Sequence, residues 1–295
     1  MLMNFFRSLF KGKRSSDDGE YPDQETTVPE SAMSESIATR TVLPEPDAPE
    51  PAAQGSQAQD IVLSIPGIWP DWSSFVDAMA GDGDGDFLIA GRMLYHRKAK
   101  FHMDIVFEGS DPELESAFRE GAGSRMTEPE FAAIGAHRSV VSLTAATGSM
   151  EHAFAAVACA GAVLLAGGIA VKVDTAGGAF NRDIWAAIAD DEIGFTAAFL
   201  ELVREKPGSI RSYGLRAFGL RDVQCEGDYP DAILDFVINT FIKSLLFENQ
   251  NFIGGETFSP APEAPVFRLN FVRDEAQTSG PAFHNPYGVI RLEQV

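Results

Sequence analysis

The feature that most constrains this chain is an abrupt change in composition near residue 60. Residues 15–60 hold eleven Asp or Glu against the single Arg40, with many Pro and Ser and few large apolar side chains. Such a segment cannot bury enough apolar surface to offset the entropy lost on ordering it. Beyond it the sequence becomes strongly patterned. We therefore predict a disordered leader over 1–59, a folded domain over 60–275 and a C-terminal tail over 276–295.

The leader itself divides into two parts. Residues 1–14 carry four basic side chains and no acid, with Phe5, Phe6, Leu9 and Phe10 spaced to share one helical face. This order, apolar before basic, is the reverse of a secretory signal. The tip could touch an anionic membrane surface, but a frayed chain end explains so short a stretch more simply. The Pro-rich remainder is typical of an extended acidic tether.

Charge and cysteine content exclude several classes of protein. The net charge is −20, so bulk electrostatics would repel a nucleic-acid backbone, and we expect no nucleic-acid partner. Cys159 and Cys225 are too few for a disulfide framework or a four-ligand zinc site, although a pairing between them stays open. We interpret both as reduced apolar residues of a cytoplasmic protein.

One uncharged stretch, residues 153–171, is long enough to suggest a membrane span. Its composition favours another interpretation. Alanine and glycine dominate it, Gly167 and Gly168 interrupt it, and the residues that follow alternate like a strand. A buried helix leading into a buried strand explains these features together, so we predict no transmembrane span.

The hydrophobic periodicity predicts an alternation of strands and helices. Expected strands cover 61–66, 87–95, 101–107, 139–145, 169–174, 210–218, 222–226, 252–258 and 266–271; expected helices cover 71–79, 111–121, 128–134, 149 onward, 183–189, 195–206 and 228–247. The basic turn at 97–100 marks a hairpin. We predict an α/β (α+β) fold, a mixed sheet with helices packed on it. It should contain at least one right-handed β-α-β unit, made by 139–145, the buried helix and 169–174.

Three short motifs resemble those of a bacterial protein family. They are His-Arg-Ser-Val-Val-Ser-Leu-Thr at 137–144, Tyr-Gly-Leu-Arg-Ala-Phe-Gly-Leu at 213–220 and Phe-Ile-Gly-Gly-Glu-Thr at 252–257. Together they resemble the domain-of-unknown-function family numbered 4261, over most of residues 60–275. Glu256 departs mildly from that family, whose last motif more often has Asp there. The resemblance implies a bacterial cytosolic α/β domain, and it implies no reaction and no catalytic residue.

No motif for metal or cofactor chemistry stands out. The alternating aspartates at 81–86 look like the start of a calcium loop, but Phe87 and Met93 occupy the positions where that loop needs Gly and Glu. The histidines show no metal-ligand spacing, and the chain has no phosphate-binding or nucleophile-elbow motif. We therefore predict no metal and no cofactor.

One site hypothesis comes from the predicted β-α-β unit. If strands 139–145 and 169–174 are parallel neighbours, the loops at 146–149 and 175–181 emerge at one sheet edge, where open α/β sheets bind ligands. Both loops are rich in glycine and hydroxyl groups and precede helices, whose free N–H groups accept anions. The candidate ligand-binding residues are Thr147, Ser149, Asp174, Thr175 and Asn181. Against this, Glu151 would repel an anion, and Ser149 and Asn181 are also typical N-caps.

Two functions therefore remain open. We expect a non-enzymatic bacterial module that binds a protein partner or a small ligand; the alternative is an enzyme of unknown reaction with its site at the two glycine-rich loops. A pocket that gathered several polar groups would favour the enzyme. Such a pocket would bring together His137, Asp174, Thr175, Asn181 or Glu256.

Overall fold

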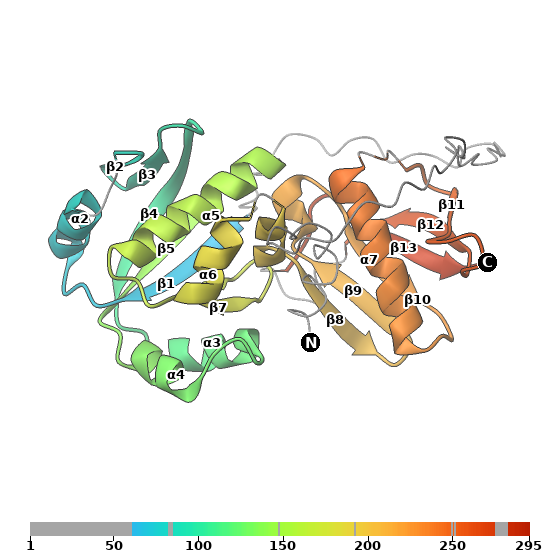
Figure 1. The fold of residues 1–295 in the computed structure, drawn as a ribbon, viewed down its shortest axis with the longest axis horizontal. Helices are drawn as coiled ribbons and strands as arrows, with labels where there is room; N and C mark the ends of the chain where they lie inside the picture. The colour runs from blue at the N-terminus through green and yellow to red at the C-terminus, as the bar shows by residue number, and fades with distance from the viewer. Residues whose placement is uncertain are drawn as a thin grey trace, which may run out of the picture. The chain divides into compact units, whose positions relative to one another are not determined.

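The structure is a computed structural model, and it describes residues 61–81, 85–146, 148–191, 193–248, 250, 252–274 and 283–295. All of these belong to one compact unit, Ser56–Val295. The leader predicted at 1–59, with its apolar tip and acidic tether, lies outside the described residues, and so does Thr147. The helices and two sheets of the unit confirm the predicted α+β class (Figure 1).

The first sheet has seven strands in the order β2-β3-β4-β5-β1-β6-β7. Their bounds are β1 Ile61–Gly67, β2 Phe87–Ala90, β3 Met93–His96, β4 Phe101–Gly109, β5 Ser139–Ala145, β6 Ala170–Val173 and β7 Ala179–Asn181. The predicted hairpin is confirmed, since β3 and β4 pair antiparallel across the basic turn. The predicted strand 87–95 is instead two strands, which turn at Gly91 with a φ of +63°.

The position of β1 corrects the site hypothesis. β1 pairs antiparallel with both β5 and β6 and lies between them. The strands β5 and β6 therefore run in the same direction and are joined by a helix, but they are not neighbours. The prediction that 139–145 and 169–174 are adjacent parallel strands was wrong, because the first strand of the domain inserts where the crossover leaves room for it.

Helix α5, Met150–Leu165, is the buried helix predicted from the uncharged stretch. Eight of its residues are buried, including Val157, Cys159 and Val163, and it packs on β1, β3, β4 and β6. It ends before Gly167, whose φ of +114° suits glycine alone. None of the helices in the described part of the chain is long and apolar enough to cross a bilayer.

Four shorter helices accompany this sheet. They are α2 Trp72–Gly81, α3 Leu114–Ala122, α4 Glu128–Gly135 and α6 Arg182–Ala189. Helices α3 and α4 enclose a small apolar cluster around Phe118 and Ile134 with residues of β5, β6 and β7. α3 begins at Leu114 rather than at the predicted 111, where Asp111 accepts a hydrogen bond from the Glu113 backbone instead.

The second sheet has six strands in the order β11-β12-β13-β10-β9-β8. Their bounds are β8 Glu201–Lys206, β9 Ser209–Tyr213, β10 Asp222–Glu226, β11 Thr257–Phe258, β12 Phe267–Val272 and β13 Val289–Gln294. Helix α7, Asp231–Phe247, packs on β9 and β10. The pair β10–β13 is parallel and the other strand pairs of this sheet are antiparallel.

Four predictions fail in this sheet. The strand predicted at 252–258 is only the two-residue β11. The helix predicted at 195–206 is a short 3-10 helix, η1 Gly194–Ala198, followed by strand β8. The strand predicted at 210–218 ends at Tyr213, and η2 Leu215–Phe218 is another 3-10 helix. The predicted tail at 276–295 contains β13, an interior strand between β10 and β12. At 195–206 and in the tail, pairing with a distant strand overrides the local pattern; at 210–218, Gly214 with a φ of +102° ends the strand.

Candidate functional site

Two of the predicted ligand-binding residues are helix caps. Ser149 Oγ accepts a hydrogen bond from the His152 backbone N–H at 3.2 Å and begins α5. Asn181 Oδ1 accepts one from the Ile184 N–H at 2.8 Å and begins α6, while its Nδ2 donates to Glu130 Oε1 at 2.8 Å. These bonds satisfy N–H groups that a helix start leaves unpaired.

Asp174 and Thr175 fasten the end of β6 to β1. The Asp174 carboxylate accepts hydrogen bonds from Ser64 Oγ at 2.5 Å and from Lys172 Nζ at 2.6 Å. Thr175 Oγ1 accepts from the Val62 N–H at 3.4 Å, and Thr175 is buried. These interactions explain both residues as parts of the sheet.

The predicted set does not come together. Asn181 pairs with Ala170 at the start of β6, the opposite end from Asp174. His137 is buried between α4 and β5, where Nδ1 donates to Ile134 O at 2.6 Å and Nε2 accepts from the Asp111 N–H at 2.9 Å. Glu256 lies next to the second sheet and accepts from the Ile253 N–H. The convergence that would favour an enzyme is not seen among these residues.

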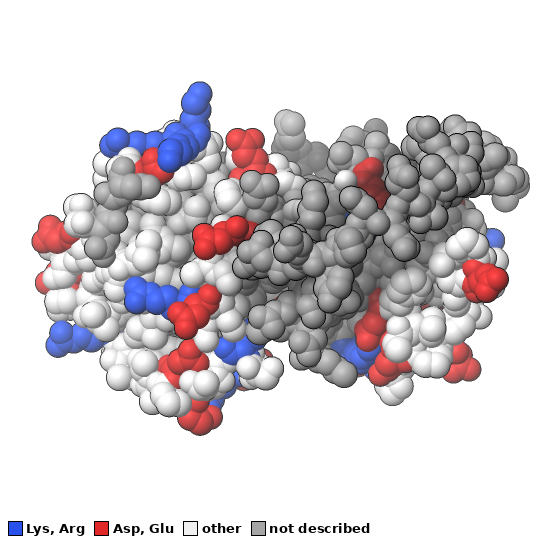
Figure 2. All heavy atoms as spheres, viewed as in Figure 1, with Lys and Arg blue, Asp and Glu red and all other residues white. Residues whose placement is uncertain are grey.

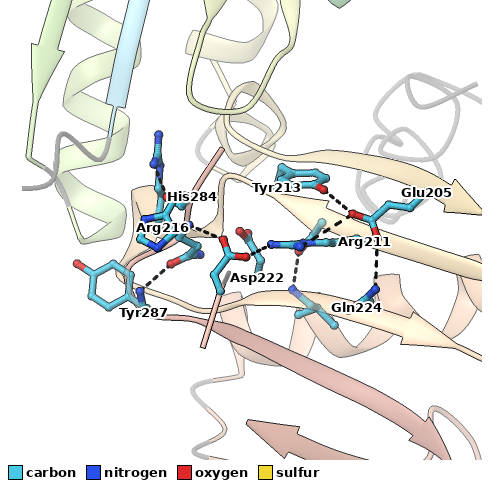
Figure 3. Close-up of polar contacts among 12 residues, drawn as sticks. Glu205, Arg211, Tyr213, Arg216, Asp222, Gln224, His284 and Tyr287 are labelled. Carbon is cyan, nitrogen blue, oxygen red and sulfur yellow. Dashed lines mark hydrogen bonds and ion pairs between the residues drawn. The ribbon is translucent and has the colours of Figure 1, made fainter. Parts of the chain in front are cut away.

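A different group of polar residues is buried on the second sheet (Figure 3). Arg211 of β9 lies opposite Gln224 of β10, Tyr213 and Asp222 follow at the next alternate positions of these strands, and each of the four is at most 8% exposed. They occupy alternate positions, so they share one face of the sheet, while Ile210, Val223 and Cys225 occupy the other. We call Glu205, Arg211, Tyr213, Asp222, Gln224 and Asp274 the β9–β10 cluster.

Arg211 is the centre of the cluster. Its Nη2 donates to Asp274 Oδ1 at 2.7 Å, its Nη1 lies 3.9 Å from Glu205 Oε1, and its guanidinium carbon lies 4.8 Å from the centre of the Tyr213 ring. Burial disfavours its charge, but the hydrogen bond and charge of Asp274 outweigh burial and raise the pKa of Arg211. Tyr213 and Gln224 in turn donate to the two oxygens of Glu205, at 2.6 and 3.3 Å.

Asp222 is fully buried beside this arginine. Burial raises the pKa of its carboxyl to about 7, although the Asn285 side chain, the Leu215 N–H and the Arg211 charge all oppose the shift. Its Oδ1 accepts a hydrogen bond from the Leu215 N–H at 3.1 Å. The carboxyl therefore keeps its proton to a higher pH than an exposed aspartate does.

Two atoms of the cluster have no hydrogen-bond partner among the described residues, Arg211 Nε and Asp222 Oδ2. Asn285 is near the carboxyl, and the hydrogen bond of its side chain lowers the pKa of Asp222; its Nδ2 also donates to Leu220 O at 3.0 Å, and its Oδ1 accepts from the Tyr287 N–H at 2.9 Å. Buried polar groups in native proteins are almost always paired. The cluster therefore contains two buried polar atoms whose hydrogen bonds are not supplied by the described residues.

The segment before β13 holds the cluster in place. The Asn285 N–H donates to Asp274 Oδ2 at 2.8 Å, and Arg216 Nη1 donates to the His284 carbonyl at 2.6 Å. Sequence reasoning missed this site because it treated 210–218 and 222–226 only as strands. The available signal was the alternation of polar with apolar residues in Ser-Ile-Arg-Ser-Tyr and Asp-Val-Gln-Cys-Glu, which predicts a polar face on each strand.

Over the described ranges, no group of three or more His, Cys, Asp or Glu residues is arranged to hold a metal ion. Comparison of the chain with protein-family models, with curated proteins and with solved structures gave no match. The resemblance to the bacterial domain family stays a prediction.

Proposed function

We propose that this chain is a binding module that takes a small polar ligand at the β9–β10 cluster. The observation that carries the proposal is the pair of buried atoms without a partner among the described residues: Arg211 Nε, which is a donor, and Asp222 Oδ2, which accepts when the carboxyl is ionised. The neighbouring groups are already paired with one another. A ligand that offers one acceptor and one donor would complete the network.

Charge favours a neutral ligand. The Arg211 guanidinium is already balanced by Asp274 and faces Glu205, so an added anion would meet more acid than base. A cation would lie against the guanidinium itself. Hydroxyl and amide groups carry a donor and an acceptor without charge, so a small neutral molecule with such a group is the chemistry that best fits.

Binding without catalysis is supported by the environment of the two cysteines and of one buried histidine. Burial raises the pKa of both Cys159 and Cys225 to about 12, so neither thiol ionises at neutral pH. Both ring nitrogens of His137 are engaged by the backbone. The free state of the two buried cysteines, together with the family resemblance, also supports a bacterial cytoplasmic location.

A thermal-shift screen tests this proposal. The full-length protein is heated with a panel of sugars, nucleosides and amides at millimolar concentration. We expect at least one compound to raise Tm, since a ligand that binds only the native state stabilises it. The shift should disappear in Arg211→Lys, which lacks the Nε donor in its position, and in Asp222→Asn.

Arg291→Lys is the matched control, because Arg291 pairs with Gln224 on the same face of the sheet and is exposed. It should keep the full shift. A panel without any stabilising compound, or a shift that survives in Arg211→Lys and Asp222→Asn, would overturn the proposal.

A further inference from the structure

The outward face of α5 is apolar from Phe154 to Leu165. Its outward positions are Phe154, Ala158, Gly161, Ala162 and Leu165, of which Phe154 and Leu165 are 37% and 68% exposed. No charged residue occurs in the helix after Glu151. A helix that is apolar on every side normally has every side covered. We call these five residues the α5 stripe.

The stripe extends beyond the helix and has charge only at its borders. Ile68, 59% exposed, lies beside the helix end, since its Cγ1 is within 3.7 Å of where a Cβ on Gly167 would be. Figure 2 shows this side of the molecule, with a largely white surface over α5 and acidic and basic residues around it. Contiguous exposed apolar surface of this kind marks interaction sites.

The centre of the stripe is open. A Cβ built on Gly161 meets no atom within 4 Å. Ala158, Gly161 and Ala162 therefore form a shallow region between the larger Phe154 and Leu165. Small residues in the middle of a helix face allow a second helix to approach closely.

The spacing of large and small residues along the α5 stripe is the same whether the helix is followed from its start or from its end. From Phe154 to Ala158 is four residues, from Ala158 to Gly161 three, and from Gly161 to Leu165 four. If two such helices pack antiparallel about a two-fold axis, Phe154 of one copy opposes Leu165 of the other, and Ala158 opposes Gly161. Large residues then meet at both ends and small residues at the centre, which is the self-complementarity that an isologous interface requires.

Charge favours the same arrangement. Glu151 is exposed at the start of α5, and Arg182 is exposed at its other end, where its guanidinium donates to the Leu164 carbonyl. An antiparallel pair brings Glu151 of one copy toward Arg182 of the second copy, at both ends of the interface. It also sets the two helix dipoles in opposite directions. No like charges face each other along the stripe.

We infer that the α5 stripe is the interface of a homodimer, in which α5 of one copy packs antiparallel against α5 of a second copy. This association does not depend on ligand binding at the β9–β10 cluster. The two-fold axis passes between Ala158 and Gly161.

Sedimentation velocity of the full-length protein over a range of concentrations tests the dimer. We expect a concentration-dependent dimer, and in Gly161→Glu a dimer at least about tenfold weaker, because two like charges would be buried at the axis. Gly161 has open space, so this change should leave the fold intact, which circular dichroism verifies. Phe236→Glu on α7, at a position that is 48% exposed, is the matched control and should dimerise normally.

Cross-linking tests the geometry independently of affinity. The double variant Ala158→Cys with Gly161→Cys should form a covalent dimer on mild oxidation, since each new cysteine opposes the other across the axis. Phe236→Cys should form no covalent dimer under the same treatment. A monomeric wild type at all concentrations, a dimer unaffected by Gly161→Glu, or a double variant that fails to cross-link would each overturn the inference.

Discussion

Replacing Asp222 with Asn should change how the stability of the protein depends on pH. The pKa of Asp222 is about 7 in the folded protein, against an ordinary value of 3.8. The folded state therefore holds a proton that the unfolded chain releases above about pH 4. Its stabilising contribution is fully present below that pH and is lost as the pH rises through about 7. The amide of the Asp222→Asn variant cannot titrate, so the variant would lack this dependence.

The magnitude follows from the shift. About three pKa units correspond to roughly 4 kcal/mol between the two limits, at about 1.4 kcal/mol per unit. Between pH 5 and pH 8, a range that includes most of the change, the wild type should lose roughly 3 kcal/mol relative to Asp222→Asn. With a urea dependence of about 3 kcal/mol per molar, the difference between the two unfolding midpoints should move by about 1 M.

The assay is urea unfolding of both proteins at pH 5 and pH 8, followed by tryptophan fluorescence. The buried indole of Trp185 reports on the first sheet, and circular dichroism reports on both sheets. Any local cost of the Asn amide is the same at both pH values, so it cancels from the comparison. If the difference in midpoint stays constant from pH 5 to pH 8, Asp222 is not a buried carboxyl with a raised pKa, and the description of the cluster fails.

Three other outcomes are expected. Gly161→Ala should raise the free energy of unfolding by about 0.5–1 kcal/mol in chemical denaturation, because glycine weakens a helix interior and the added methyl meets no atom; a destabilised variant would contradict this. His137→Leu should cost about 1 kcal/mol in the same measurement, since it removes the acceptor of the partly buried hydrogen bond from the Asp111 N–H. Cys159 and Cys225 should not react with a thiol reagent at pH 8 until urea unfolds the chain, because both are buried with pKa values of about 12; fast labelling of the native protein would refute it.

Much of the first sheet was predictable because its signals are local. The hydrophobic run at Ile61, the basic turn at 97–100 and the uncharged stretch at 153–171 each identify an element without reference to the rest of the chain. The order of the strands was not predictable in this way. The sequence between β5 and β6 has the same length whether the two strands touch or enclose β1, so only long-range pairing decides.

The second sheet shows where local patterns mislead. The segment Glu-Leu-Val-Arg-Glu-Lys has good helix formers, and a helix was expected over 195–206. It is a strand because its residues pair with β9, where Glu201 lies opposite Tyr213 and Val203 opposite Arg211. Propensity is a weak preference, and the hydrogen bonds of an edge strand together with the contacts of its inner face exceed it.

The same long-range pairing hid the candidate site. Arg211 and Asp222 look ordinary in sequence, since a charged residue on a strand usually faces water. They are buried because Asp274 and Asn285, which are distant in the sequence, lie beside them and because β13 occupies the centre of the sheet. No sequence pattern within 210–226 identifies Asp274 and Asn285 as the neighbours of these residues.

The chain order of this sheet links the site to the completion of the fold. β13 comes last in the chain but lies between β10 and β12, and the Gly288 carbonyl that precedes it accepts a hydrogen bond from the Asp222 N–H at 3.1 Å. The residues that position Asp222 and Asp274 therefore arrive only when the C-terminal segment joins the sheet. A cluster that buries a carboxyl with two unpaired polar atoms is costly to form. Strand β13 both completes the sheet and buries these polar groups. The free-energy cost of burying them therefore has to be offset by the strand pairing of β13 or by a bound ligand.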